Sequence, residues 1–96
     1  VLALRPEPME PLKALGLRLL ERGDAAASER LFRDLAERFP DWAGVFFQRG
    51  RALERLARFE EARLVYERAA TLRPAWTEAQ DALTRILAIA PARKAS

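Results

Sequence analysis

Residue types recur at a fixed offset of 34 positions along this chain of 96 residues. The later copy is marked by Gly50, Leu53, Tyr66 and Pro74, and the earlier copy by Gly16, Leu19, Phe32 and Pro40. Agreement in type at one offset is hard to obtain by chance, so the chain is expected to contain two copies of one structural unit. A further step of the same offset carries Leu53 to Leu87, which predicts one more helix before the chain ends.

The composition favours helices within each unit. Half of the residues are hydrophobic but only 8% are aromatic, so the core must consist mainly of Leu and Ala. Ala, Leu, Arg and Glu have high helix propensities, whereas the strand formers Val, Ile and Thr are scarce. The sequence therefore predicts an all-α protein, and a chain of 96 residues fits one domain.

Turn residues and hydrophobic spacing divide the chain into five expected helices. They run from about 11 to 22, from 25 to 39 and from 42 to 57, then from the turn at 58–60 to about 73, and from 77 to 90. Asp24 and Asp41 are expected to cap the second and third helices. The spacing of Thr77 and Gln80 predicts a capping box at the start of the fifth helix.

The segment from Phe46 to Pro74 resembles a known repeat. A large apolar residue, Phe46, is followed four positions later by a small one, Gly50. Further along, the small residue Ala62 is followed four positions later by the aromatic residue Tyr66. These spacings resemble the tetratricopeptide repeat, a helix–turn–helix unit of about 34 residues. The resemblance implies an α-solenoid of antiparallel helix pairs, with five helices in a right-handed superhelix. Its repeats would span 9–42 and 43–76, followed by a capping helix at 77–90 and a tail at 91–96.

The beginning of the chain parallels the end of the second unit. Ala3-Leu4-Arg5-Pro6 corresponds to Thr71-Leu72-Arg73-Pro74, and Pro6 precedes Pro40 by the offset that separates the two copies. Residues 1–8 are therefore expected to be a tail that resembles the end of a preceding repeat. The chain is accordingly expected to be a fragment of a larger protein.

The resemblance also implies a function. In this family the first helix of each repeat lines a concave groove that receives a peptide or a helix of a partner protein. The corresponding groove positions are Lys13, Leu17, Leu20, Phe47, Gln48, Arg51, Asp81 and Arg85, and Glu54 is also expected to face the groove. The expected function is a non-catalytic protein–protein interaction module. The alternatives are an oligomerisation or assembly module, which would form a homo-oligomer, and a substrate-recruiting appendage of an enzyme domain.

Leu17, Leu20 and Phe47 would give the groove an apolar centre. These side chains could anchor an apolar group of the partner, with Lys13 and Arg51 binding a carboxylate or a carbonyl. Alternatively, Phe47 packs between neighbouring first helices. Chaperone-binding members of the family use a five-residue carboxylate clamp, whose positions here hold Lys13, Leu17, Gln48, Glu78 and Ala82. Because Glu78 would repel the ligand where the clamp has Lys, the sequence argues against that binding mode.

Several other residues have competing interpretations. Arg49 interrupts the apolar stripe of the third helix and is expected to lay its stem along apolar surface, with a buried carboxylate partner as the alternative. Trp42 and Trp76 are expected to pack between repeats. Glu60 and Glu61 are expected on a solvated face rather than in an acid–base site, since adjacent helical residues point about 100° apart.

The residue types that most often carry chemistry are absent. The chain has no Cys and no His, so no catalysis, metal or cofactor is expected. The net charge is +3, but 14 acidic residues are interspersed with 17 basic ones, which argues against nucleic-acid binding. No apolar run reaches the roughly 20 residues that cross a membrane. A cytoplasmic location is the expectation, although a lack of Cys suits an exported protein equally well.

Overall fold

The computed structural model describes residues 10–91, with side chains described from residue 13 onward. Within this range the chain forms five helices and no strand: α1 (Glu10–Glu21), α2 (Ala25–Arg38), α3 (Ala43–Arg55), α4 (Phe59–Leu72) and α5 (Thr77–Ile89). The all-α prediction is confirmed, and the helix bounds agree closely with the expected ones. The tail predicted at residues 1–8 lies outside the described residues, as do residues 92–96 of the second tail.

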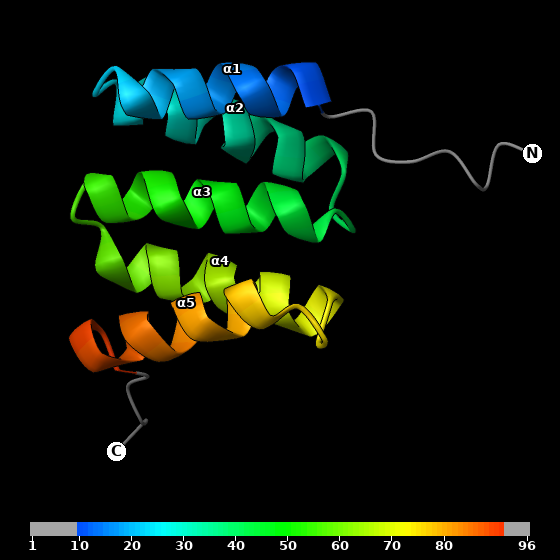
Figure 1. The fold of residues 1–96 in the computed structure, drawn as a ribbon, viewed down its shortest axis with the longest axis vertical. Helices are drawn as coiled ribbons and strands as arrows, with labels where there is room; N and C mark the ends of the chain where they lie inside the picture. The colour runs from blue at the N-terminus through cyan, green and yellow to red at the C-terminus, as the bar shows by residue number, and fades with distance from the viewer. Residues whose placement is uncertain (1–9, 92–96) are drawn as a thin grey trace, which may run out of the picture.

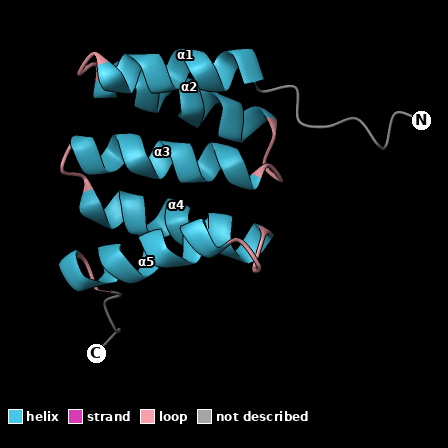
Figure 2. Cartoon of the chain, viewed as in Figure 1, coloured by secondary structure: helices cyan, strands magenta, loops and turns pink. Residues whose placement is uncertain are grey.

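The helices form two antiparallel pairs and one further helix. α1 packs on α2, α3 packs on α4, and the two pairs meet where α2 contacts α3; α5 packs on α4. Figure 1 shows α1, α3 and α5 toward the viewer and α2 and α4 behind them, so the molecule is an open stack with two layers. Short links join the ends of successive helices on alternating sides of the stack (Figure 2). We call the side formed by α1, α3 and α5 the first-helix face.

The turn between α1 and α2 follows the prediction. Gly23 has a φ of 86°, a left-handed conformation that glycine adopts at little cost. Asp24 is the N-cap of α2, and its carboxylate accepts a hydrogen bond of 3.2 Å from the backbone N–H of Ala27. This bond satisfies one of the free N–H groups at the helix start, which confirms the predicted cap.

The caps predicted for α3 and α5 are wrong by one residue. The helix α3 begins at Ala43, so Trp42 is its N-cap and Asp41 lies one position before the cap. Trp42 makes no side-chain capping bond. In α5, Thr77 is the first helical residue rather than the cap. The amide of Gln80 donates instead to the carbonyl of Pro74 at 3.2 Å, so the predicted capping box is not formed.

A ring seated against a glycine closes each helix pair. A Cβ atom at Gly50 would lie 2.5 Å from Cε1 of Tyr66, and a Cβ atom at Gly16 would lie still closer to the ring of Phe32. Such distances are far shorter than any van der Waals contact, so only glycine allows the ring of the second helix to approach this closely. Both copies of the unit make this contact at equivalent positions, which explains why glycine and ring recur together in the sequence.

An ion pair lies at the junction of α2 and α3. Glu29 on α2 is only 2% exposed, and its carboxylate accepts a hydrogen bond of 3.0 Å from Nε of Arg49 on α3. Guanidinium nitrogens of Arg33 and Arg58 also lie 3.9 Å from this carboxylate. The expectation that Arg49 extends its charge into water is therefore wrong, and the alternative of a buried carboxylate partner holds.

The first helix, α1, leaves a large apolar side chain exposed. Leu15 on this helix is 48% exposed. The equivalent position holds Arg49 in α3, where it contacts α2, and Leu83 in α5, where it packs on the core between α3, α4 and α5. Leu15 thus occupies a position that contacts the preceding pair, and among the described residues no pair precedes α1.

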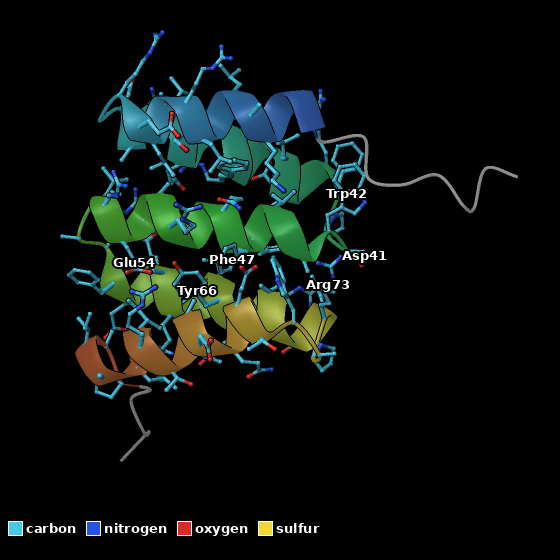
Figure 3. All side chains as sticks on the ribbon, viewed as in Figure 1. Asp41, Trp42, Phe47, Glu54, Tyr66 and Arg73 are labelled. Atoms are coloured by element: carbon cyan, nitrogen blue, oxygen red, sulfur yellow. The ribbon has the colours of Figure 1, made fainter. Side chains whose placement is uncertain are left out.

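Both tryptophans pack at the links between helices. Trp42 stacks on Phe39 with ring centroids 3.8 Å apart, and both rings lie against the core of the α2–α3 junction. Trp76 lies 4.8 Å from the ring of Phe47 on α3. Figure 3 shows Trp42 on the side of the stack where the link from α2 to α3 lies. These contacts agree with the packing role expected for both residues.

Candidate functional site

Three helices line a hollow on the first-helix face. Its volume is about 270 Å³, and its lining consists of Leu20 from α1, Arg51, Glu54 and Arg55 from α3, and Arg85 from α5. The three residues of α3 lie within two turns, at spacings of three and four residues that place side chains on one side of a helix. We call this site the arginine hollow, because three of its five residues are arginines.

A carboxylate is already bound inside the arginine hollow. Arg85 donates two hydrogen bonds to Glu54, one to each carboxylate oxygen, with Nη2 at 3.0 Å from Oε2. The hydroxyl of Tyr66 on α4 donates to the same Oε2. The labelled Glu54 and Tyr66 side chains lie between α3 and the helices below it in Figure 3. These bonds join α3, α4 and α5 through one acidic group.

The charge state of this carboxylate follows from its partners. Burial by itself raises the pKa of Glu54, but hydrogen bonds from Arg85 and Tyr66, together with the charges of Arg85 and Arg51, outweigh it and hold the pKa below the ordinary value. Burial and the bond to Glu54 raise the pKa of Tyr66. The bond to Glu54 also raises the pKa of Arg85. At neutral pH the hollow therefore contains one carboxylate anion among three cations.

Arg51 and Arg55 are exposed and bind only neutral acceptors among the described residues. Arg51 donates to the amide oxygen of Gln48 at 3.2 Å, and Arg55 donates to the backbone carbonyl of Leu20 at 3.3 Å. Every ion pair found in the described range involves other arginines. The arginine hollow thus holds two guanidinium groups for which residues 13–91 supply no bound carboxylate.

The structure brings together only some of the predicted site residues. Leu20, Arg51 and Arg85 meet in the arginine hollow. Asp81 is exposed on α5, four residues before Arg85 and therefore on the same side of that helix. Lys13 and Leu17 are half-buried on α1, and Leu17 packs against the small core that contains Leu20.

Three predicted site residues are less accessible than expected. Leu20 is 2% exposed and Gln48 is 7% exposed, so neither presents an open side chain. Phe47 is half-buried, with its ring 5.8 Å from that of Tyr66 and 4.8 Å from that of Trp76. The contacts of Phe47 agree with the alternative expectation that it packs against neighbouring helices, and Leu20 offers no open surface to a partner. These apolar side chains pack against neighbouring helices, because the stacking of pairs needs them there.

The prediction omitted one residue of the hollow, Arg55. Arg55 follows Arg51 by four residues, a spacing that alone would have placed both arginines on one side of α3. Glu54 was expected to face the groove, but its bonding partner was not predicted. Its bond to Arg85 joins residues 31 positions apart and depends on how α5 packs, which no local pattern reveals.

Acidic residues of α4 also form ion pairs with arginines. Glu61 accepts two hydrogen bonds from Arg58, at 2.7 and 2.8 Å, and this interaction holds the pKa of Glu61 below its ordinary value. Glu60 and Glu67 flank Arg63. Within residues 10–91, no group of three His, Cys, Asp or Glu side chains is arranged to hold a metal ion. None of the described helices has the length and apolarity of a membrane span.

The fold and the recurring pair geometry define an all-α solenoid of antiparallel helix pairs. The family model for the tetratricopeptide repeat matches residues 43–76. The solution NMR structure of a tetratricopeptide repeat domain protein from Salinibacter ruber superposes with a TM-score of 0.75 at 24% sequence identity, covering 95% of this chain and 100% of that one. A search of curated proteins gives no match.

Residues 43–76 therefore match the tetratricopeptide repeat, and the chain has the fold of a tetratricopeptide repeat domain. Repeats of this family generally mediate protein–protein interaction and are typically non-catalytic scaffolds.

Proposed function

We propose that this chain is a protein-binding module that receives a peptide or a helix of a partner protein on its first-helix face. The observation that carries the proposal is the arginine hollow, an open site of about 270 Å³ built by one helix from each of three successive units. A segment lying across α1, α3 and α5 would contact all three helices at once. The repeat at 43–76 supports this function, because repeats of this kind generally bind proteins.

The proposal assigns the chain two repeats and a closing helix. The contact of Gly16 with Phe32 reproduces that of Gly50 with Tyr66, which supports residues 9–42 as a first repeat. α5 covers α4 as a first helix would, which supports residues 77–90 as the cap of the array. In this organisation the binding face has three helices, and its edges are α1 and α5.

The test is a selection of binders from a phage-displayed library of short random peptides. Binding of the selected peptides is then measured by fluorescence polarisation. We expect the single variants Arg51→Glu and Asp81→Arg, which alter the first-helix face at two helices, to weaken binding. Arg30→Glu is the matched control, because Arg30 is exposed on α2, in the other layer. Failure to select any peptide, or equal losses in all three variants, would contradict the proposed binding face.

A second candidate function is assembly, and one observation favours it. Leu15 is 48% exposed at the position where Arg49 and Leu83 contact a preceding helix. A second copy of the chain that covered α1 would bury this leucine. Light scattering across a range of protein concentrations tests this role. An oligomer that dissociates in the variant Leu15→Ser would support assembly, whereas a monomer at all concentrations would argue against it.

A further inference from the structure

We propose that the arginine hollow binds an acidic side chain of the partner, with the carboxylate held between Arg51 and Arg55. The inference rests on the proposed function and specifies which chemical group the partner must present. Side chains four residues apart on a helix have Cβ atoms about 6 Å apart, so two long arginine side chains can reach one carboxylate. Guanidinium groups bind carboxylates through paired, charge-assisted hydrogen bonds.

The chain itself shows how a carboxylate is bound at this place. Glu54 is held by two hydrogen bonds from Arg85 and one from Tyr66, and its side chain is only 18% exposed. Arg85 is thereby committed to an internal anion. Arg51 and Arg55 have only the neutral oxygens of Gln48 and Leu20, which are weaker acceptors than a carboxylate. The unmatched positive charge of the hollow lies on these two residues.

Charges around the hollow favour a single carboxylate over a chain of phosphates. Glu54 is inside the site, and Glu78 and Asp81 are exposed on the same side of α5 as Arg85. These three anions would repel a nucleic-acid backbone, whose affinity depends on several phosphate contacts at once. A peptide with one acidic side chain places its charge only at the hollow and can offer neutral or basic groups to α5.

The test is a titration followed by NMR, which detects the Nε–H signals of individual arginines. The probes are acetyl-Gly-Glu-Gly-amide, its neutral analogue acetyl-Gly-Gln-Gly-amide, and inorganic phosphate, each added at equal concentration to the whole chain. We expect the Glu peptide to shift the signals of Arg51 and Arg55 in a saturable way, and the Gln peptide to leave them unchanged. The variant Arg51→Gln/Arg55→Gln should weaken binding of the Glu peptide by about tenfold or more. Arg30→Gln, which removes one charge at an exposed site on α2, is the control outside the hollow and should bind as the wild type does.

Three outcomes would overturn the inference. They are unchanged Arg51 and Arg55 signals, equal shifts with the Glu and Gln peptides, and equal or stronger binding of phosphate. The peptides selected from the phage library show whether a failure concerns the acidic ligand alone or the proposed protein-binding function as a whole. Peptides that need the first-helix face but lack acidic residues, and that bind Arg51→Gln/Arg55→Gln normally, would overturn the acidic ligand while leaving the binding module intact.

Discussion

Nε of Arg49 lies 3.0 Å from a carboxylate oxygen of Glu29, and this ion pair joins the first helix pair to the second. The Glu29 side chain is 2% exposed and that of Arg49 is 19% exposed, so the pair is largely withdrawn from water. Removing two charges from water is costly, and a buried pair adds little stability over apolar residues of similar size. Breaking the pair is different, because it leaves one buried charge uncompensated.

The variant Arg49→Leu should therefore lower the free energy of unfolding by about 3 kcal/mol, measured by urea denaturation. Arg33 and Arg58 lie 3.9 Å from the same carboxylate and should reduce the loss only in part. The double variant Glu29→Leu/Arg49→Leu should recover most of the stability, since it removes both charges. Arg30→Leu, at an exposed site on α2, should change stability by less than about 0.5 kcal/mol. Equal effects of the single and double variants would contradict an uncompensated charge as the cause.

Gly50→Ala should destabilise the fold by about 2 kcal/mol, because the new methyl group would lie 2.5 Å from Cε1 of Tyr66. Gly16→Ala should act in the same way through Phe32. If the clash is the cause, Phe32→Leu should be less harmful in the Gly16→Ala background than in the wild type. A double-mutant cycle by thermal denaturation measures this coupling. Additive effects would indicate that the ring contact is not what requires glycine.

Glu54 should make stability depend on pH in the acid range. Its folded-state pKa lies below the ordinary 4.5, so the ionised group stabilises the fold at neutral pH. That contribution is lost as pH falls from about 5 through the folded-state pKa. Glu54→Gln should thus be less stable than the wild type at pH 7, and the difference should shrink toward pH 2. Urea midpoints at each pH measure it. Glu37→Gln is the control, because Glu37 is exposed and forms no ion pair with any residue from 13 to 91.

Asp24→Ala should cost about 1 kcal/mol of unfolding free energy, because it removes the bond to the N–H of Ala27. Asp41→Ala provides a comparison within the same chain, since Asp41 stands one residue before the true N-cap of α3. We expect it to change stability by less than about 0.5 kcal/mol. Thermal denaturation of both variants measures the difference. A larger loss for Asp41→Ala would mean that this carboxylate caps α3 in solution.

The period of the sequence was sufficient to predict the fold. Gly16 and Gly50 recur with Phe32 and Tyr66 because each ring packs against a glycine. This requirement is visible in the sequence as a glycine and an aromatic residue at the same spacing in both copies. Helix ends were also predicted closely. The caps of α3 and α5 were not, because a tryptophan without a capping side chain occupies each N-cap and carries no cap signal.

The candidate site was predicted less completely than the fold. The resemblance assigned Arg51, Asp81 and Arg85 to the groove, and all three side chains are exposed. It did not indicate how far the apolar residues of that face are covered: Leu20 is 2% exposed and Phe47 is half-buried. Burial at those positions depends on the distance between neighbouring helices, which the spacing within one helix does not contain.

The two junctions of the stack carry different charges, with a consequence for how such an array can grow. At equivalent positions of the two units, Glu29 corresponds to Arg63 and Arg49 corresponds to Leu15. A tandem duplication of the first repeat would set buried Glu29 against leucine, and a duplication of the second would set Arg63 against the arginine at position 49. Either event leaves a charge without its counterion. Lengthening the array by duplicating one of its own repeats would therefore require a compensating substitution where the two copies of that repeat meet.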